Sequence, residues 1–265
     1  MQERGYEIDV LPILPNGQID LMALKAALRP DTVLVTLCAV DSELGVIQPV
    51  AEAAELLQGY PNCQLHVDVT QAVGKIPVDL QYADTAALSA HKFGGVTGSG
   101  ILYKKRSVEM EPLIHGGVST SLYRSGTPAA GLAASLTAAL EHAVHALPGH
   151  LEHVNMLNSF LRQELTKRNV RIFSPESAIT YILNVGVEGV KGAAMRDQLN
   201  RHGVCVSVKS ACSVENTPSR AVYAVTKNRR QALESFRISL SHLTTEAEIL
   251  VFLRFFDLSR KELQA

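Results

Sequence analysis

The stretch from Val33 to Val40 constrains the fold most strongly, because nearly every position in it is apolar. A strand with both faces buried inside a parallel sheet has this composition. The acidic segment Asp41-Ser42-Glu43 follows at its carboxyl end, and Pro49 to Leu57 then has helical spacing with a proline near the first turn. Further short apolar runs follow. Strands that alternate with helices predict βαβ units in a doubly wound, mostly parallel α/β sheet.

The remaining elements divide the chain into two domains. In the first part we expect strands at Tyr6 to Leu11, Leu65 to Val69, Thr85 to Leu88 and Ile101 to Tyr103, and a helix at Leu21 to Leu28. In the second part we expect helices at Pro128 to Ala146, Leu151 to Arg168, Ala193 to His202 and Thr244 to Lys261, and strands at Val170 to Phe173, Tyr181 to Val187, Val204 to Val206 and Phe236 to Leu240. The sequence therefore predicts a large sheet domain over residues 1–140 and a smaller α+β domain over residues 141–265.

Composition excludes several classes of function. The chain has 265 residues, 46% of them hydrophobic, and a net charge of −1, which gives no electrostatic case for binding nucleic acid or an anionic membrane. No apolar run has the length of a membrane span, and the first residues do not resemble a signal peptide. The four cysteines show no paired spacing, so free thiols and a cytoplasmic location are expected.

A polar turn that carries a lysine follows the run Thr85 to Leu88. It reads Ser89-Ala90-His91-Lys92-Phe93-Gly94-Gly95, and a residue just past a strand end lies where open α/β sheets bind their ligands. Asp68 closes the preceding strand, and Ser125 to Pro128 has the composition of a helix start, which can bind an anion. An amine, a carboxylate and an anion site are together what pyridoxal 5'-phosphate (PLP) requires.

Each residue of this set has a specific candidate role. Lys92 would form the Schiff base with PLP and, once released, move the substrate Cα proton. Asp68 would keep the pyridinium nitrogen protonated, and Gln71 could donate to the ring hydroxyl. Ser89 and His91 could both reach the phosphate. The alternatives are a surface lysine, a strand-end cap and an ordinary helix-start residue.

Three residues outside this turn are also candidates. Thr127 precedes Pro128, which suits a helix N-cap beside a phosphate, or ordinary capping alone. Cys212 lies in Lys209-Ser210-Ala211-Cys212-Ser213, which has no strand or helix period, so an exposed thiol beside Lys209 could be a nucleophile of depressed pKa. Arg237 stands in an apolar strand, where it would bind a substrate carboxylate or form an interior salt bridge.

The other cysteines and four of the histidines are expected to have structural roles. Cys205 is expected in the core because valines flank it, and Cys38 and Cys63 also have apolar neighbours. The histidines at 142, 145, 150 and 153 fit two helix faces across Pro148-Gly149. No cysteine or acid completes a ligand set there, so no metal site is predicted.

These motifs, in this order, resemble cysteine desulfurases, which are PLP-dependent enzymes of fold type I in the class V aminotransferase group. The segments that carry the resemblance are His66-Val67-Asp68, Gln71-Ala72-Val73-Gly74-Lys75, Ser89-Ala90-His91-Lys92, His115-Gly116-Gly117, Arg124-Ser125-Gly126-Thr127, Ser210-Ala211-Cys212-Ser213 and Phe236-Arg237-Ile238-Ser239-Leu240. They extend nearly from end to end of the chain.

The resemblance implies the fold, the reaction and the site. The fold would be PLP-dependent transferase fold type I. L-cysteine would become L-alanine, with its sulfur left on Cys212 as a persulfide for an iron–sulfur scaffold or a tRNA-thiolation partner. Thr127 would reach the phosphate of the partner subunit's cofactor, which implies a homodimer, and Arg237 would hold the cysteine carboxylate.

The chain departs from the family pattern at three places. The Gly-rich, phosphate-binding turn and the ring-stacking histidine of the family have no counterpart in this chain, so an incomplete large domain, weak PLP binding and low turnover are expected. Asp41-Ser42 stands where an asparagine usually lies near the ring oxygen, which makes Ser42 a shorter candidate ligand. Lys209 replaces a usual glycine, which could stiffen the cysteine loop or lower the thiol pKa.

Two alternatives to the desulfurase reading stay open at this point. A non-catalytic remnant could act as a dimerising or sulfur-partner-binding module, which the missing segment and Asp41-Ser42 favour. A PLP-dependent lyase, such as a selenocysteine lyase, would keep the cofactor but not require Cys212.

Overall fold

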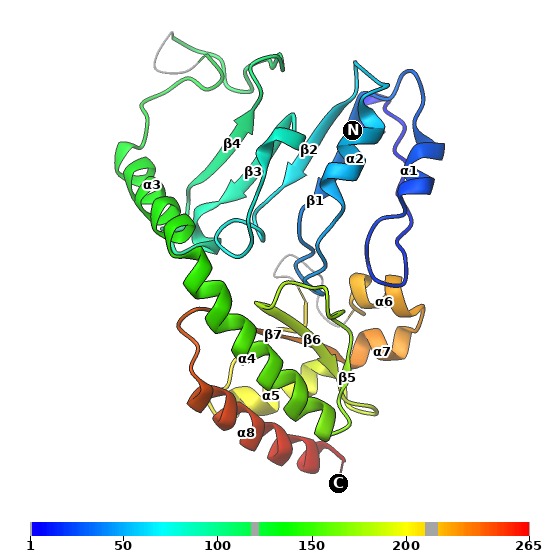
Figure 1. Ribbon diagram of the computed structural model, residues 1–265, viewed down its shortest axis with the longest axis vertical. Coiled ribbons are helices and arrows are strands. Elements are labelled where there is room, and N and C mark those ends of the chain that lie inside the picture. Colours follow the sequence, from blue (N-terminus) through cyan, green and yellow to red (C-terminus); the bar gives the residue numbers. More distant parts are fainter. Residues whose placement is uncertain (1, 118–121, 210–216, 265) are drawn as a thin grey trace. The chain divides into compact units, whose positions relative to one another are not determined.

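The computed structural model describes residues 2–117, 122–209 and 217–264 (Figure 1). The chain divides into two compact units. The sheet unit holds residues 29–39 and 50–147, and the C-terminal unit holds residues 1–28, 40–49 and 148–265. Two segments that the sequence pattern placed in the large domain thus group with the C-terminal part. Among the described residues, no helix combines the length and the apolar character needed to cross a membrane.

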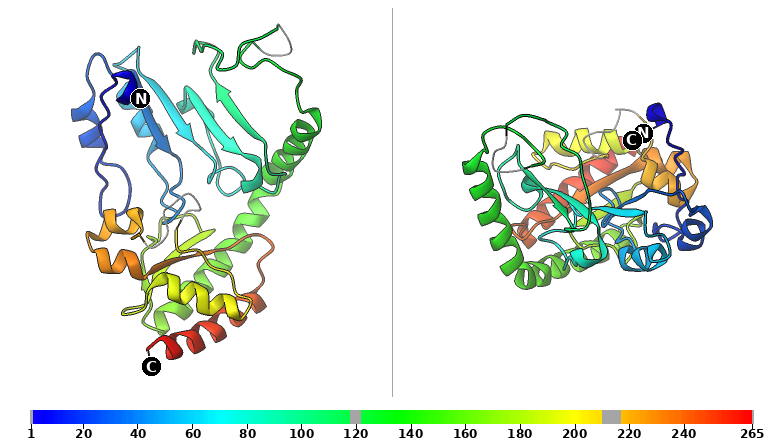
Figure 2. Two further views of the ribbon diagram at one scale, coloured as in Figure 1. Left: turned by 180° about the vertical axis from the view of Figure 1, so that it is seen from behind. Right: turned by 90° about the horizontal axis from the view of Figure 1, so that it is seen from above.

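The sheet unit is built on a mostly parallel sheet, as expected. Its strands are β1 (Leu34–Cys38), β2 (Gln64–Asp68), β3 (Thr85–Ser89) and β4 (Gly100–Lys104), which lie side by side in that order (Figures 1 and 2). The strands β1, β2 and β3 pair in parallel, and β4 is antiparallel to β3. Alternate residues such as Leu65, Val67, Ala86 and Leu88 are buried, so one face of the sheet forms the core of this unit.

Helices and short turns follow the strands of this unit. The helix α2 (Val50–Leu57) packs against β2, and η2 (Leu80–Tyr82) precedes β3. The 3-10 turn η3 (Ala90–Lys92) directly continues β3, and the helix α3 (Ala130–His145) packs against η3. The strand ends and the turn that carries Lys92 are therefore held by elements of one compact unit.

The C-terminal unit has its own antiparallel sheet of β5 (Arg171–Ile172), β6 (Ile182–Gly186) and β7 (Ser235–Ser239), in that order. Its helices are α1 (Leu21–Ala27), α4 (Leu147–Lys167), α5 (Gly192–Arg201), α6 (Arg220–Thr226), α7 (Arg229–Glu234) and α8 (Glu246–Gln264). Figure 2 shows α5 alongside α8, and α5 also packs on β7. Gly192 permits this packing, because a Cβ there would collide with the carbonyl oxygen of Ser235.

The segments before residue 50 join the C-terminal unit through packing and hydrogen bonds. Leu44 and Val46 are buried in a cluster with Val222 of α6. The Gln48 side chain accepts a hydrogen bond from the Ile19 N–H (2.9 Å) and donates to the Gly17 carbonyl (3.0 Å). Apolar burial and paired polar groups therefore place residues 12–19 and 40–49 beside the C-terminal elements.

Several predicted elements are wrong. Tyr6 to Leu11 forms no strand: no neighbouring strand among the described residues pairs with it, and Tyr6, Ile8 and Val10 are exposed. Val204 to Val206 also lacks strand structure; Ser207 alone bridges to β7. The helix α4 begins at Leu147 rather than Leu151, since a proline is tolerated in the first turn of a helix. The helices α6 and α7 were not predicted, because both are too short for a clear period.

Candidate active site

The predicted cofactor ligands of the sheet unit lie at the carboxyl ends of adjacent parallel strands. Asp68 is the last residue of β2 and pairs in register with Ala87 of β3. Ser89, two residues further on, ends β3, and His91 and Lys92 follow in η3. Because side chains alternate along a strand, Asp68, Ala87 and Ser89 share one face of the sheet. This edge is where open α/β sheets bind ligands.

The side chains of this group are free to meet a ligand. Asp68, His91 and Lys92 are exposed, and the Ser89 hydroxyl makes no capping hydrogen bond. One Asp68 oxygen accepts a hydrogen bond from the Thr70 N–H (2.8 Å), which fixes the carboxylate at the strand end. Within the described part of the chain, the Lys92 ammonium makes no hydrogen bond.

A second lysine, Lys75, connects the segments that carry these groups. Its Nζ lies 3.4 Å from Oε1 of Gln71 and 3.2 Å from the main-chain oxygen of Lys92. Burial is the larger cause, and the charge of Lys92 the smaller, of a lowering of the Lys75 pKa to about 8. The ammonium of Lys75 therefore lies inside the unit, close to the turn that carries Lys92.

Thr127 is not the N-cap of the following helix, which corrects the prediction. The helix α3 begins at Ala130, and its N-cap is Ala129, which has no side chain that can cap. Ala129 still has ψ of 73°, and Gly126 has φ of +113°, so helical geometry begins only after Pro128. Thr127 is exposed in this irregular segment.

Arg237 lies on β7 in the C-terminal unit, beside a buried asparagine. It pairs in register with Asn184 of β6, and its Nη1 donates to the Ser42 carbonyl (2.7 Å). Its Nε is buried and has no hydrogen-bond partner among the described residues; the same is true of the Asn184 side-chain oxygen. Burial lowers the pKa of Arg237, and the carboxylates of Glu43 and Asp41 oppose that lowering. The guanidinium thus keeps one N–H, at Nε, without a partner among the described residues.

The Asp41-Ser42 segment is engaged within the C-terminal unit. One Asp41 oxygen accepts the N–H groups of Glu43 (3.0 Å) and Leu44 (2.5 Å). Glu43 is buried; its carboxylate accepts from the Ser219 hydroxyl (2.5 Å), and its main-chain carbonyl accepts from the Asn184 side chain (3.1 Å). Asp41 therefore acts as a turn cap, and Ser42 offers its carbonyl to Arg237.

The predicted nucleophile, Cys212, lies outside the described residues. Lys209 is the last described residue before this segment, and its Nζ donates to the Thr217 hydroxyl (2.7 Å) and carbonyl (2.9 Å). Cys38, Cys63 and Cys205 are free thiols, as expected. The core prediction for Cys205 is wrong: it is exposed, because its segment is not a strand of the sheet. Cys63 is buried, and burial raises the pKa of its thiol.

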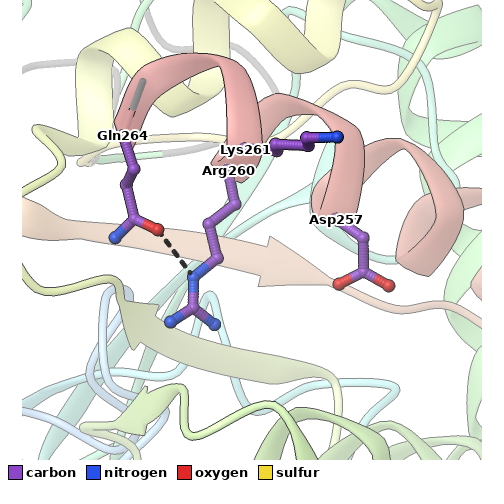
Figure 3. Close-up of a pocket in the computed structure, with 4 residues that line it drawn as sticks. All are labelled: Asp257, Arg260, Lys261 and Gln264. Atoms are coloured by element: carbon purple, nitrogen blue, oxygen red, sulfur yellow. Dashed lines mark hydrogen bonds between the residues drawn. The ribbon is translucent and has the colours of Figure 1, made fainter.

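Two histidines and the polar residues of a surface pocket make contacts within the protein. His150 stacks on His242 with ring centroids 3.9 Å apart, and Nε2 of His153 lies 2.8 Å from the Thr244 carbonyl oxygen. A surface pocket on α8 is lined by Asp257, Arg260, Lys261 and Gln264 (Figure 3). There the Arg260 side chain donates to Gln264 (3.3 Å), and Asp257 pairs with Arg168 (3.0 Å). The pocket contains none of the predicted site residues.

Sequence reasoning assigned no role to Lys75, Glu43 and Asn184. For Lys75 a signal was present: it stands four residues after Gln71, the spacing that brings two side chains together on one helical turn. For Asn184 and Glu43 the contact joins residues far apart in sequence, and no local pattern reports such a contact.

The fold, the polar residues around Asp68 and Lys92 and those around Arg237 agree with a known family. The chain belongs to the aminotransferase class-V family, whose sequence model matches residues 1–252. Proteins of this family use PLP.

Its relatives include several cysteine desulfurases. The chain is 32% identical over 255 residues to cysteine desulfurase IscS of Dictyoglomus turgidum, and 33% identical over 267 residues to a cysteine desulfurase of Sinorhizobium fredii. These matches cover 94% and 98% of this chain, but 64% and 69% of the relatives. For the mitochondrial cysteine desulfurase of Arabidopsis thaliana, 34% identical, the covered share of the relative is 56%. The chain therefore spans about two thirds or less of the relatives' length in most cases.

Solved structures agree with this assignment. A NifS-like protein superposes with a TM-score of 0.91 at 31% identity, over 98% of this chain and 70% of that protein. A second structure, SspA in complex with cysteine, has a TM-score of 0.75 at 27% identity, over 92% of this chain and 69% of that one.

The donor set of the sheet unit fits PLP. An exposed carboxylate, Asp68, ends β2, and an exposed amine, Lys92, lies in the turn that follows the neighbouring strand β3; the Ser89 hydroxyl and His91 ring are available for a phosphate. Gln71 adds an amide beside them. These are the groups that an aldehyde, a ring nitrogen, a phosphate and a ring oxygen require.

Proposed function

We propose that this chain carries the active site of a PLP-dependent cysteine desulfurase, which converts L-cysteine to L-alanine and takes the sulfur onto Cys212. The observation that carries the proposal is the placement of Asp68 at the carboxyl end of β2 and of Lys92 in the turn after the adjacent parallel strand β3, in a member of this family. Relatives named cysteine desulfurase, and a relative structure in complex with cysteine, support the substrate.

The residues of the sheet unit would hold the cofactor. Lys92 would bind the aldehyde covalently, Asp68 the ring nitrogen and Gln71 the ring oxygen, while Ser89 and His91 bind the phosphate. Bound PLP supplies an electron sink for charge that develops on the substrate carbon. Lys92, once displaced by the substrate amine, would take the proton from Cα.

The C-terminal residues would handle the substrate. Arg237 would bind the cysteine carboxylate through the N–H groups left free by its bond to Ser42. The thiolate of Cys212 would attack the substrate sulfur, so that an S–S bond forms while the Cβ–S bond breaks. The persulfide stays on Cys212, and the carbon skeleton leaves as alanine after protonation.

The same proposal includes the setting of the enzyme. A cytoplasmic location, a homodimer in which Thr127 reaches the partner's phosphate, and a sulfur acceptor such as an iron–sulfur scaffold are its further parts. The net charge and the cysteine spacing of the sequence support the location, and the Arg124-Ser125-Gly126-Thr127 motif supports the dimer.

Two experiments test the proposal: borohydride reduction of the PLP adduct, and sulfide release from L-cysteine by cysteine variants of the chain. The chain is incubated with excess PLP and reduced, and peptide mapping is expected to find the adduct on Lys92 and none in Lys92→Ala. Sulfide release from L-cysteine with a thiol reductant is expected to fall by at least a hundredfold in Cys212→Ala.

Cys205→Ala is the matched control, because Cys205 is an exposed thiol of the C-terminal part. It should keep the wild-type rate. Unchanged activity in Cys212→Ala would support a lyase instead, and an absent adduct at high PLP would support a non-catalytic module.

A further inference from the structure

We propose that Lys75 is a positioning residue of this site: it fixes the amide of Gln71 so that the N–H groups, and not the oxygen, are left for a ligand. It also holds the turn that carries Lys92. The inference rests on the proposed function, because it concerns the same site.

The backbone after β2 brings Gln71 and Lys75 together. The Val73 N–H donates to the Val69 carbonyl and the Ile76 N–H to the Ala72 carbonyl, each at 3.0 Å, so the segment forms two turns, and Gly74, with φ of +74°, lies in the second of them. The Nζ of Lys75 is 3.4 Å from Oε1 of Gln71.

The chemistry of the two groups settles how the amide lies. An ammonium group has three N–H donors and no acceptor, whereas an amide has an oxygen that accepts and an NH₂ group that only donates. Turning the amide over would place its NH₂ against the ammonium, two sets of donors together. Lys75 therefore selects one orientation, and both N–H donors of Gln71 stay free for an acceptor such as the ring oxygen of PLP.

A second bond from the same ammonium fixes the lysine turn. Nζ lies 3.2 Å from the main-chain oxygen of Lys92. Gly74, the residue before Lys75, has φ of +74°, and a Cβ there would lie 3.2 Å from Cβ of Phe93, the residue after Lys92. The two turns are thus in close contact. Burial and the nearby charge of Lys92, which lower the Lys75 pKa to about 8, agree with an ammonium enclosed between them.

A PLP titration of the full chain tests the inference. The dissociation constant is measured from the absorbance of bound PLP for the wild type, Lys75→Met, Gln71→Ala and the double variant. Lys75→Met is expected to raise it by about tenfold, the effect of a hydrogen bond to a charged group. In the Gln71→Ala background the same substitution should raise it by about threefold or less, because interacting groups are not additive. An equal rise in both backgrounds, or no rise in either, would overturn the inference.

Lys104→Met is the matched control. Lys104 also donates to main-chain carbonyls in the sheet unit, those of Lys105 (3.2 Å) and Val108 (2.9 Å), but it pairs with Thr85 at the other end of β3. The PLP dissociation constant of Lys104→Met should stay within twofold of the wild-type value. An increase like that of Lys75→Met would show a general loss of folded protein and would overturn the inference.

A further variant avoids removal of Lys75 altogether. Gln71→Glu keeps an oxygen for Lys75 but has no N–H to offer, so it should weaken PLP binding as much as Gln71→Ala does. Wild-type affinity in Gln71→Glu would contradict the proposed orientation. Failure of the wild type itself to bind PLP is a different result, which would overturn the proposed function and this inference with it.

Discussion

Lys75 in the sheet unit and Arg237 in the C-terminal unit are both partly buried cations that donate to a main-chain carbonyl, that of Lys92 or of Ser42. Burial lowers the pKa of both. Their surroundings differ: the charge of Lys92 lowers the Lys75 pKa further, to about 8, whereas the carboxylates of Glu43 and Asp41 support the charge of Arg237.

The difference matches the tasks proposed for the two residues. A guanidinium stays charged at every pH of interest, which suits a residue that binds a carboxylate. An ammonium whose pKa lies near 8 is charged at neutral pH but loses its proton in mild alkali. The charge of Arg237 is therefore fixed, and the charge of Lys75 is adjustable.

The largest effect is expected at Arg237. Arg237→Gln removes the charge and leaves the Ser42 carbonyl without its donor, so kcat/KM for L-cysteine should fall by about a hundredfold, roughly 3 kcal/mol, mostly through KM. Steady-state kinetics in excess PLP measures this. Arg196→Gln is the control, since Arg196 is a half-buried arginine that pairs with its neighbour Asp197. A fall in kcat alone would contradict a carboxylate-binding role.

The second prediction separates the two cations by pH. The Lys75 pKa is lower in the folded chain than in the unfolded chain, so between about pH 8 and pH 10.5 the unfolded state binds more protons. The free energy of unfolding of the wild type, relative to Lys75→Met, should therefore rise with pH across this window, by at most about 3 kcal/mol. The cost of the buried ammonium is present below pH 8 and disappears above pH 10.5.

Urea unfolding at pH 7.5, 9 and 10.5 measures this difference. The same experiment on Arg237→Gln should show no comparable rise relative to the wild type, because the guanidinium keeps its proton throughout. A flat difference for Lys75 would show that its pKa is not lowered, and the contrast between the two cations would be lost.

The sheet unit could be predicted from sequence better than the C-terminal unit, for a physical reason. Apolar runs such as Leu65 to Val69 and Thr85 to Leu88 form strands because burial on one or both faces leaves little other choice. Asp68 and Lys92 could be proposed as site residues because Asp68 lies near the end of one such run and Lys92 lies in the polar turn after the other. Tyr6 to Leu11 alternates equally well but has no partner strand in the part of the chain that the structure describes, and alternation alone does not supply one.

The parts that could not be predicted depend on contacts between distant segments. The bond from Asn184 to Glu43 and the bond from Arg237 to Ser42 each span far more of the chain than any local period covers. The prediction that Thr127 caps the helix was wrong for a different reason. The backbone angles of Gly126 and Ala129 are not helical, so the helix begins only after Pro128. The types and spacing of residues in the sequence show which side chains can interact, but the backbone conformation determines where those side chains lie.

The smallest effect concerns packing beside Lys75, and it asks whether this turn depends on close contact as well as on hydrogen bonds. Gly74 and Gly98 both have positive φ, +74° and +92°. A Cβ on Gly74 would lie 3.1 Å from Cβ of Ala143 and 3.2 Å from Cβ of Phe93, whereas one on Gly98 would meet nothing within 4 Å. Both alanine variants should lose about 1 kcal/mol of stability from left-handed backbone strain.

Gly74→Ala should lose about 1 kcal/mol more, because neighbours must shift to admit the methyl group. Urea midpoints at pH 7.5 measure this difference. Since the shift displaces Phe93, and with it the turn of Lys92, Gly74→Ala should also weaken PLP binding, while Gly98→Ala should not. Equal losses in both assays would mean that hydrogen bonds alone hold the lysine turn, as they hold Arg237 against Ser42. A difference would mean that the site in the sheet unit, unlike the arginine site, also depends on the closeness of two backbones.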